Sequence, residues 1–600
     1  MFHTLRENTR TAIPYGQIYF DTETNFKENL SGDTEHTLKL GVAIYIRYEK
    51  DLTVHTRKVL KFTTPLEFWN FVQTEIRSTR RIVLFAHNIF FDLWITQFYK
   101  QAFDHGWESK IPFTKGIMYI DKLKSGKFTI DLINVGNFFK STVKAMGDLV
   151  GLPKLDVDFE NVSVEKLWVY CQRDVEILEK VMNGWFHFIK DNDLGNFGLT
   201  LPSQAFNAYR HRFMGQLIYM HRSGQPEQLE RKSYKGGRVE CFFIGKAPKD
   251  TYYKIDINSM YPYIMKNREF PYRCMYSLKN PDIRRLPKCL KDYCVVAEVD
   301  IETEEPVYPV HYDQRTIFPV GKFKAVLTTP SLKYAYLHNH IKRLGQVALY
   351  NKANLFADYI DFFYTKRKQY QACGNLIYKE CCKVLMNSLY GKFGQKLRLQ
   401  KTETFPDIEV IRREMIIDSR DGMVKQVITF GGKQRTTEIK EVESFNSFCA
   451  IASHVTDYAR MLLWQYIQKA PEGTLFYCDT DCLIVNREGY QVYENDIDKD
   501  ELGMFKIEDI STELEIRGLK HYRFGKHWKR KGIRKQAEQL AENTFIMDIW
   551  PGFPLVFDRK LSEPYPVHKQ VKELSGLYTK GDVHENGWVT PIRLRLETGN

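Results

Sequence analysis

Apolar and polar residues alternate in short runs over residues 1–190, and longer stretches with apolar residues three or four positions apart lie between these runs. The alternating runs predict strands near Gln17–Phe20, Leu40–Tyr45, Arg81–Phe85 and Phe128–Ile130. The longer stretches predict helices near Pro65–Thr79 and Val164–Trp185. This mixture indicates an α/β domain over residues 1–195, because the polar, turn-rich stretch 191–196 is a suitable boundary.

Beyond this boundary the pattern is less regular. One helical pattern runs from Asn354 to Tyr390 and is the longest in this part of the chain. Residues 396–439 are polar and β-prone, and they lie between Gly391 and Asp479. We therefore predict that this segment is an insertion with its own hairpin.

Two aspartates stand at the tip of a second predicted hairpin. In YCDTDC, residues 477–482, Asp479 and Asp481 separate two apolar stretches. Asp256 ends another alternating segment in KIDINSMYP, residues 254–262. Two-metal phosphoryl transfer needs carboxylates from more than one segment, and these three supply them. The alternative for Asp479 and Asp481 alone is an ordinary polar turn.

The first domain carries a separate set of carboxylates. In QIYFDTETN, Asp21 and Glu23 follow an apolar strand, and the strand period of two turns both side chains to one side. In LFAHNIFFD, a second apolar strand leads into Asn88 and Asp92. A metal ion could join these carboxylates, whereas the alternatives are a turn cap for Asp21 and a helix cap for Asp92.

A third segment of this domain, YCQRD, places Tyr170 and Asp174 four residues apart on one face of a helix. Tyr170 could orient a water molecule there, and Asp174 could complete a metal pair. The alternative for Asp174 is a solvated helix charge. The order of the three segments along the chain favours a joint site.

The segment KVLMNSLYGKFG, residues 383–394, closes the long helical pattern. At about 3.6 residues per turn, one helix face gathers Lys379, Lys383, Asn387 and Tyr390. The packed back of the helix is expected to hold Ile377, Cys381 and Val384. Cations and a flat ring suit the phosphates and the base of a nucleoside triphosphate. The alternative is a solvated lysine stripe with a packing tyrosine.

The composition favours a globular protein of several domains, since 43% of the 600 residues are apolar. The net charge of +13 favours a polyanionic partner such as nucleic acid. The 11 cysteines include no C-x-x-C pair, so neither a zinc site nor a disulfide framework is indicated and a reducing compartment is expected. No apolar run is long enough to span a membrane, and we expect a cytoplasmic protein.

These motifs resemble those of family B DNA polymerases. The 3′–5′ exonuclease motifs of that family match Asp21 with Glu23, Asn88 with Asp92, and Tyr170 with Asp174. The palm and fingers motifs match the segments 256–262, 383–391 and 477–481. Lys154, in LPKLDVDF, is similar to a lysine that the protein-primed branch places before its third exonuclease motif. A surface lysine is the alternative there.

The resemblance implies two metal ions per active site, Mg²⁺ with Mn²⁺ as a substitute. The implied metal ligands are Asp256 and Asp479 in the polymerase site, and Asp21, Glu23, Asp92 and Asp174 in the exonuclease site. Asp481 belongs to the catalytic set, but it is a less direct ligand. The implied substrates are dNTPs and a DNA primer and template.

The resemblance also implies residues that bind the nucleotide and the DNA. Tyr261 would exclude a 2′-hydroxyl, Lys383 would hold the triphosphate and Tyr390 would contact the nascent base pair. The implied DNA-binding residues are Tyr234, Gly236 and Gly237 in YKGGRVE, Asn88, and Lys520 and Tyr522 in GLKHYRF. The basic cluster that follows, with Lys529 and Arg530, is predicted to contact the duplex backbone.

The implied fold is multidomain, α/β and α+β: a ribonuclease H-like exonuclease domain followed by a right-hand palm, fingers and thumb with two insertions. The expected ranges are exonuclease 1–195, palm 196–265 and 441–534, first insertion 266–356, fingers 357–394, second insertion 395–440 and thumb 535–600. With its long segment after the fingers motif, the chain resembles the protein-primed branch of this family. That branch is found in small linear-genome phages, adenoviruses and linear plasmids.

In that branch the first insertion contacts a terminal protein that serves as primer, and the second insertion supports strand displacement. We therefore expect a monomer that replicates a linear viral or plasmid genome. Three alternatives stay open: a nucleic-acid-primed or primer-independent family B polymerase, an inactive DNA-binding relative, and a dedicated repair exonuclease. The chain departs from the family at Gln371 and Gly374, where a further cation is expected, and Lys366 or Arg367 could substitute for it.

Overall fold

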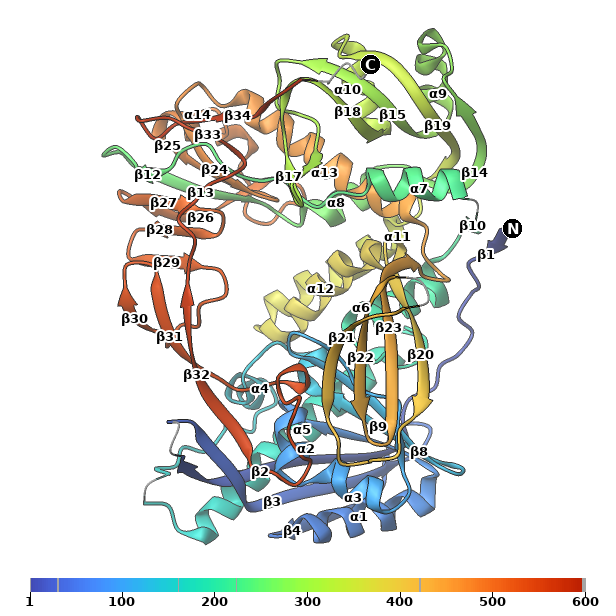
Figure 1. Cartoon of the computed structure of the whole chain (residues 1–600), viewed down its shortest axis with the longest axis vertical. Helices are drawn as coiled ribbons and strands as arrows, with labels where there is room; N and C mark the ends of the chain where they lie inside the picture. Colours follow the sequence, from blue (N-terminus) through green and yellow to red (C-terminus); the bar gives the residue numbers. More distant parts are fainter. Residues whose placement is uncertain (1, 30–31, 160, 223, 420–421, 596–600) are drawn as a thin grey trace.

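A computed structural model describes residues 2–29, 32–159, 161–222, 224–419 and 422–595 (Figure 1). Within these ranges the largest sheets have 11, seven and five strands. Figure 1 shows the 11-stranded sheet at the bottom, the seven-stranded sheet at the upper right and the five-stranded sheet at the upper left. The helices α11 and α12 lie between the upper and lower parts.

The lower sheet is built from the first domain. Its central strands, in spatial order, are β3 (Thr34–Tyr48), β2 (Gly16–Glu28), β5 (Arg81–Ala86), β9 (Phe128–Asn134) and β8 (Met118–Ser125). Its edges carry β4 (Val54–Phe62), β6 (Glu108–Ser109) and β7 (Phe113–Lys115). Its helices include α1 (Pro65–Thr79), α2 (Ile89–Ile95), α3 (Phe98–Asp104), α4 (Val143–Leu149) and α5 (Val164–Asp191).

The strand period places helices on both faces of this sheet. Tyr19 and Ile44 share a core cluster with α5, whereas Ile18 and Tyr45, one position away, share another with α1. The helix α5 begins at Ser163, whose side chain accepts a hydrogen bond from the N–H of Lys166. All the strands and helices predicted for this domain are present, and the α/β prediction is confirmed.

The five-stranded sheet lies within the range predicted for the palm. Its strands, in spatial order, are β11 (Val239–Cys241), β24 (Leu475–Asp479), β25 (Cys482–Asn486), β13 (Tyr252–Ile257) and β26 (Phe505–Ser511). The helices α8 (Met260–Asn267) and α13 (Cys449–Lys469) pack beside it. A neighbouring four-stranded sheet contains β12 (Gly245–Lys246), β27 (Leu514–Gly518), β28 (His521–Phe524) and β29 (His527–Arg530).

The single helical pattern predicted from Asn354 to Tyr390 is wrong, because the structure has two helices there. They are α11 (Ala357–Ala372) and α12 (Leu376–Phe393). The chain breaks at Gly374, where φ is +75°, and Asn375 then caps α12 by accepting from the N–H of Tyr378. The apolar spacing continues across the break, so the sequence pattern did not reveal that the helix is interrupted.

The seven-stranded sheet holds the predicted first insertion. Its strands, in spatial order, are β1 (Phe2–Thr4), β10 (Tyr219–His221), β14 (Phe270–Lys279), β19 (Ile341–Ala353), β15 (Cys294–Thr303), β18 (Val320–Thr328) and β35 (Arg593–Leu594). The helices α9 (Leu286–Asp292) and α10 (Thr329–Leu337) belong to it. Strands from both ends of the chain thus pair at its edges.

The predicted second insertion is a four-stranded sheet rather than a single hairpin. Its strands are β20 (Lys396–Thr404), β21 (Arg412–Ile417), β22 (Val424–Phe430) and β23 (Lys433–Glu443). At its far end the ring of Phe430 packs edge-on against Tyr99, with 4.9 Å between centroids, and against Phe103, with 5.4 Å. The insertion therefore contacts the exonuclease domain.

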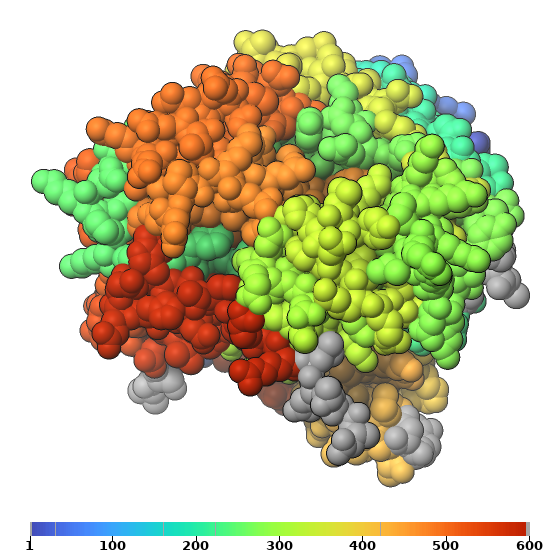
Figure 2. All heavy atoms as spheres, turned by 90° about the horizontal axis from the view of Figure 1, so that it is seen from above, coloured from blue at the N-terminus to red at the C-terminus, as the bar shows by residue number. Residues whose placement is uncertain are grey.

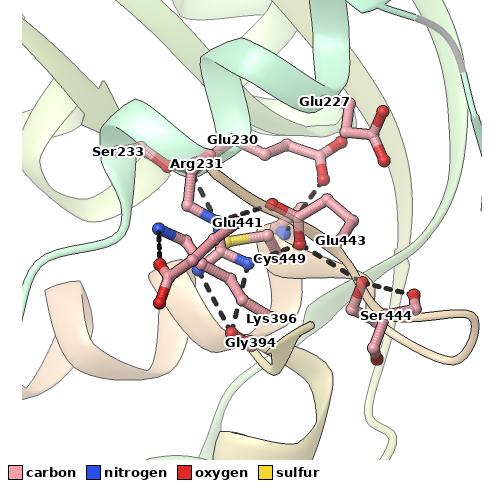
Figure 3. A network of polar contacts seen from close by, with 12 residues as sticks. Glu227, Glu230, Arg231, Ser233, Gly394, Lys396, Glu441, Glu443, Ser444 and Cys449 are labelled. Carbon is pink, nitrogen blue, oxygen red and sulfur yellow. Dashed lines mark hydrogen bonds and ion pairs between the residues drawn. The ribbon is translucent and has the colours of Figure 1, made fainter. Parts of the chain in front are cut away.

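The base of this insertion is held by one arginine of α7 (Gly224–Ser233), as Figure 3 shows. Arg231 Nε donates to Glu443 Oε1 at 2.7 Å, and Arg231 Nη1 donates to the carbonyl oxygen of Gly394 at 3.1 Å. Beside them, Lys396 Nζ pairs with Glu441 Oε2 at 2.9 Å. The guanidinium of Arg231 thus joins the two ends of the insertion.

The predicted thumb range is distributed over three places: the 11-stranded sheet, the surface of the palm and, through β35, the edge of the seven-stranded sheet. The strands β30 (Glu538–Ala541), β31 (Thr544–Ile549) and β32 (Tyr565–Glu573) extend the 11-stranded sheet through pairing of β32 with β3. The hairpin of β33 (Gly581–Val583) and β34 (Val589–Pro591) packs on the palm, where Trp588 pairs with Phe243. Figure 2 shows this last segment in red, between the palm in orange and the first insertion in light green.

Candidate active sites

The hairpin of β24 and β25 brings three carboxylates to one edge of the palm sheet. Asp479 ends β24, Thr480 has a φ of +67°, and the N–H of Asp481 donates to the carbonyl oxygen of Asp479 at 2.8 Å. The N–H of Ile257 donates to the carbonyl oxygen of Asp481 at 2.8 Å. Because Asp256 pairs opposite Cys482, its side chain lies beside the hairpin.

A cavity of about 480 Å³ lies between this edge and the fingers helices. Its palm side includes Asp256, Asp481 and Tyr261, together with Lys506 and Glu508. Its fingers side includes Arg367, Glu380, Lys383, Val384, Asn387, Ser388 and Tyr390. The cavity therefore places Asp256 and Asp481 opposite Arg367 and Lys383, which suits a nucleoside triphosphate bound with metal ions, although each side also carries one charge of the other sign, Lys506 or Glu380.

The two aspartates that line the cavity are difficult to ionise. Burial, and then the charge of Asp256, raises the pKa of Asp481 to about 7. Burial also raises the pKa of Asp256, although Lys506 Nζ lies 3.0 Å from its Oδ2 and opposes the shift. A divalent cation between the two would offset their repulsion, so this pair fits a metal ion.

Asp479 is held apart from this pair. Its Oδ1 lies 3.1 Å from Lys520 Nζ, and its Oδ2 lies 3.5 Å from Lys529 Nζ. Asp479 is not among the residues that line the cavity. Ligand atoms of all three aspartates do not gather within 4.8 Å of one another in the described structure. As placed here, Asp479 is paired with lysines.

Three of the four residues predicted to share one face of the helix α12 face the cavity. Lys383, Asn387 and Tyr390 line the cavity, whereas Lys379 does not. Lys379 lies one turn earlier in α12, toward Asn375 and away from the palm end of the helix. The prediction that Val384 belongs to the packed back of α12 is wrong in part, since Val384 also lines the cavity.

The structure indicates which residue supplies a second fingers cation. Arg367 lines the cavity, and its Nη1 donates to Ser259 Oγ at 2.7 Å. Lys366 instead lies over the ring of Phe362, with 5.8 Å between Nζ and the centroid. Of these two candidates, Arg367 is therefore the one that faces the nucleotide cavity.

Two tyrosines form the apolar end of the cavity. The rings of Tyr261 and Tyr390 have centroids 5.0 Å apart and an interplanar angle of 31°. Burial raises the pKa of Tyr261 to about 12, so its phenol stays neutral. Tyr261 comes from the first turn of α8 and Tyr390 from the last turns of α12, so the palm and the fingers meet at this pair.

The Tyr-x-Gly-Gly segment lies against the acidic hairpin. An added Cβ at Gly237 would approach the side chain of Thr480 to 2.8 Å, and the N–H of Thr480 donates to the carbonyl oxygen of Arg238 at 2.7 Å. A Cβ at Gly236 would meet nothing within 4 Å. Gly237 therefore has a packing reason to be glycine. Gly236 is exposed, so it is open to a DNA strand.

Lys520 and Tyr522 are placed differently from each other. Lys520 reaches Asp479, whereas Tyr522 is only 3% exposed and packs against Tyr477 with 5.1 Å between ring centroids. Lys529 Nζ lies 5.6 Å from the centroid of Tyr522. A primer contact by these residues stays a prediction, and Tyr522 supports the lysines in this structure.

In the first domain the four predicted carboxylates come together. Asp21 and Glu23 lie on β2, Asp92 on α2 and Asp174 on α5. Thr22 Oγ1 donates to Asp92 Oδ1 at 2.7 Å and so holds α2 to β2. Asp92 is 2% exposed and Asp174 is 5% exposed, so neither is a solvated helix charge.

These carboxylates raise one another's pKa. Burial, and then the charges of Asp92, Asp174 and Glu23, hold the pKa of Asp21 well above its usual range. Burial and Asp174 raise the pKa of Glu23 to about 7, and burial raises that of Asp92 to about 8. Such a set is stable as anions only when cations join it, so it fits divalent metal ions.

Lys154 contacts this cluster and is not a free surface lysine. Its Nζ pairs with Asp174 Oδ2 and lies 4.3 Å from the centroid of the Tyr170 ring. Burial raises the pKa of Asp174, and Lys154 opposes that shift. Tyr170 and Asp174 face the cluster from adjacent turns of α5, as their spacing predicted.

Asn88 lies at the start of α2 with a φ of +71°, and its side chain is exposed. Its N–H donates to Asn134 Oδ1 at 3.0 Å. Asn88 also lines a cavity of about 130 Å³ with Phe553 of the C-terminal segment. Cys171 Sγ lies near Asp21 and Glu23, but burial holds the pKa of its thiol well above the usual range, so it remains protonated.

Several residues of the two sites were missed by the sequence patterns. They are Ser259, Glu380, Ser388, Lys506 and Glu508 around the nucleotide cavity, and Thr22 in the exonuclease cluster. Lys506 pairs across the sheet from Asp256, and the alternation in FKIEDIS was a signal for that strand. Nothing in the sequence indicated which strand it would join.

In the part of the chain that the structure describes, we find no helix long and apolar enough to cross a membrane.

Residues 156–472 match the family model of DNA polymerase type B, organellar and viral. A probable DNA polymerase of Neurospora intermedia is 24% identical over 375 residues, which is 60% of this chain and 37% of that protein. The DNA-directed DNA polymerase of Enterobacteria phage PRD1 is 26% identical over 387 residues, which is 62% of this chain and 63% of that protein. The aligned region thus spans less than two thirds of each relative.

Among solved structures, the chain is similar to Phi29 DNA polymerase in complex with primer-template DNA and incoming nucleotide. The TM-score is 0.60 at 16% identity, over 94% of this chain and 93% of that one. This likeness shows a shared multidomain polymerase fold. The matched segment of the family model spans more than half of the chain, from α4–α5 to the end of α13. The chain therefore belongs to the organellar and viral family of type B DNA polymerases.

Proposed function

We propose that the protein is a template-directed DNA polymerase that extends a primer with dNTPs and removes mispaired 3′ ends at a separate site. The observation that carries the proposal is the cavity in which Asp256 and Asp481 face Lys383 and Arg367. Family membership supports the same activity. The relatives carry the names of DNA polymerases, including one of a bacteriophage.

The residues of the cavity suit a triphosphate. Lys383 and Arg367 would neutralise the phosphate oxygens, and Arg367 is oriented by its hydrogen bond to Ser259. Asp256 and Asp479 would hold two Mg²⁺ ions, with Asp481 beside them, after Lys520 and Lys529 turn toward phosphates of the DNA. When bound, the ions would stabilise charge on the reacting oxygens and lower the pKa of the primer 3′-hydroxyl. Mn²⁺ also prefers oxygen ligands, so it could take the place of Mg²⁺.

The second site suits hydrolysis of a 3′ end. Asp21, Glu23, Asp92 and Asp174 would hold the metal ions that activate water there. Burial raises the pKa of Tyr170, so its phenol is neutral and can orient a water molecule by a hydrogen bond. Lys154 would keep Asp174 ionised and in place. Asn88, exposed at the start of α2, would contact the strand that enters.

The two activities are separable by substitution, because the carboxylates belong to different domains. Asp256→Ala should lower dNTP incorporation by about 10³-fold or more and leave excision of a single strand near wild type. The double variant Asp21→Ala and Glu23→Ala should show the reverse. Primer extension and excision assayed side by side test this, and a variant that lost both activities would contradict the assignment if it remained folded.

We propose further that synthesis starts on a protein primer and that it displaces the downstream strand. The sheet of β14, β15, β18 and β19 sits beside the palm, where a terminal protein could present its primer hydroxyl. The alternative is a nucleic-acid-primed family B polymerase with the same catalytic residues. The discriminating experiment asks whether a labelled dNMP becomes covalently attached to a small protein from the same replicon.

The four-stranded second insertion is proposed to support strand displacement. It reaches from Arg231 at its base to Tyr99 and Phe103 of the exonuclease domain, and so spans the gap between the two domains. A bridge at this place would enclose the template and exclude the displaced strand. Deleting Thr402–Glu438 with a short linker leaves the Arg231 contacts intact and should spare single-nucleotide addition.

In the same variant, long synthesis through duplex should fail, because nothing would enclose the template or exclude the displaced strand. Addition of one nucleotide should persist, since the chemistry depends on metals held elsewhere. Rolling-circle synthesis after a single binding event measures this, with extension of a short primer as the control. A folded deletion variant that still displaced kilobases of strand would show that the segment is only a surface sheet.

A further inference from the structure

The first insertion carries a cluster of side chains that the polymerase chemistry does not use. Glu305 lies in the connection after β15, His338 follows α10 and His340 precedes β19. One ligand atom from each of these residues lies within 4.8 Å of the other two. No cysteine takes part, so the cysteine spacing that argued against a zinc site did not address this cluster.

The imidazole of His340 is oriented by a neighbour. Its Nδ1 lies 2.8 Å from the hydroxyl of Tyr308, which can accept the Nδ1 proton. Nε2 then carries the lone pair, and it lies 3.9 Å from Glu305 Oε2, too far for a hydrogen bond. Its one closer partner among the described residues is Thr303 Oγ1, at 3.4 Å. His340 thus presents a metal-binding nitrogen toward Glu305.

Glu305 is oriented from the other side. The hydroxyl of Tyr334 donates to Glu305 Oε2 at 2.8 Å, and Gln468 Nε2 donates to Glu305 Oε1 at 3.3 Å. Gln468 also donates to Tyr334 at 2.8 Å, and the ring of Tyr334 stacks on His338 with 4.1 Å between centroids. Such outer partners fix the orientation of ligands at metal sites.

We propose that Glu305, His338 and His340 bind a divalent transition metal ion of the zinc class. Two imidazoles and one carboxylate prefer Zn²⁺ or Co²⁺ to Mg²⁺, because nitrogen ligands are softer than oxygen ligands. Tetrahedral binding needs ligand atoms about 3.4 Å apart, and the exposed side chain of His338 can close that gap. Water would occupy the fourth position.

The site would lie where the first insertion meets the palm. Glu305 and the two histidines belong to the insertion, whereas Gln468, which orients Glu305, belongs to the palm helix α13. A metal ion bound there would fix the turn between α10 and β19 against the connection after β15. Its role would be structural, because nothing places it near the carboxylates of either active site.

Co²⁺ titration of the full-length chain tests the proposal. The protein carries Asp21→Ala and Glu23→Ala to remove the exonuclease ions, and Mg²⁺ is held in excess to fill the polymerase site. We expect one equivalent of Co²⁺ to give the visible absorption of a tetrahedral complex, and Zn²⁺ to displace it. His338→Asn and Glu305→Gln should each weaken binding by about 10- to 100-fold.

The matched control is His311→Asn, which removes an exposed histidine of the same insertion that lies outside the cluster. Its Co²⁺ binding should equal that of the parent. Primer extension by each variant shows that the fold is intact. The proposal is overturned if the parent gives no tetrahedral absorption, or if the absorption is unchanged in both His338→Asn and Glu305→Gln.

Discussion

The proposed exonuclease and polymerase sites have similar buried carboxylates in different electrostatic surroundings. In the exonuclease cluster neighbouring carboxylates raise the pKa of Asp21 and Glu23, and Lys154 pairs with Asp174. In the proposed polymerase site, two of the three aspartates are paired with lysines. Lys506 contacts Asp256, and Lys520 with Lys529 contacts Asp479.

This difference shows two ways to keep a metal site folded before metal arrives. The palm substitutes lysines for the metal charge, so its carboxylates are partly neutralised, and metal binding must displace or redirect those lysines. The exonuclease cluster keeps its carboxylates close together and relies on protonation instead. We expect metal removal to destabilise the exonuclease domain more than the palm.

Among variants that keep every carboxylate, Tyr261→Val should separate the sites most. The ring lies beside Tyr390 at the end of the nucleotide cavity, where it would exclude a 2′-hydroxyl, and valine would leave room for one. We expect the ratio of dNTP to rNTP kcat/KM to fall by about 10²-fold. Excision should be unchanged, and an unchanged ratio would move the sugar selection to another residue.

Lys154→Met should give the next largest effect, and only on excision. Removing this cation leaves Asp174 with a higher pKa and without its orienting partner. Loss of a group that orients a metal ligand typically costs about 10- to 100-fold in activity. Lys166→Met, which removes an exposed lysine at the start of α5, is the matched control. Equal losses in both variants would contradict a specific role for Lys154.

The sequence predicted both carboxylate sets because each is fixed by local structure. Asp21 and Glu23 share a strand face, and Tyr170 and Asp174 share a helix face, so spacing alone orients them. The cations could not be predicted in the same way. Lys506 meets Asp256 through pairing of β13 with β26, and such pairing between distant segments leaves no local signal.

The fold was less predictable where packing is not periodic. Every residue of β20 is exposed, including the alternating Leu397 and Leu399, so its apolar pattern marks no buried face and does not indicate a four-stranded sheet. The break between α11 and α12 depends on the positive φ of Gly374, which an apolar period does not reveal. The C-terminal strands join three different sheets, and only the tertiary structure decides which.

Lys506→Met should make the polymerase site more like the exonuclease site. Asp256 would lose its cation, so its pKa would rise and the pH profile of polymerisation would move to higher pH. An ion pair of this partial exposure contributes about 0.2–1 kcal/mol. The substitution should therefore change the affinity for Mg²⁺ by at most about fivefold. Lys499→Met, at an exposed lysine, is the control. A profile that did not move would show that Lys506 does not act on Asp256.

The smallest effect should be a pH dependence of stability without metal. The pKa values of Glu23, about 7, and Asp92, about 8, exceed those of ordinary carboxyls, so the folded exonuclease domain binds more protons than the unfolded chain between about pH 4 and these values. Its contribution to stability is therefore complete below about pH 4 and is lost as pH rises through about 7 to 8.

In EDTA we expect the Tm of the exonuclease domain to fall between about pH 6 and pH 8.5, by about 2–4 °C for each kcal/mol lost. Mg²⁺ should restore it, and Asp92→Asn should flatten the dependence, because the group with the pKa of about 8 is then removed. Hydrogen exchange of α5 and α13, measured at about pH 6 and at about pH 8.5, compares the two domains directly. Protection of α5 that rose with pH, or that fell no more than protection of α13, would contradict the contrast between the two sites.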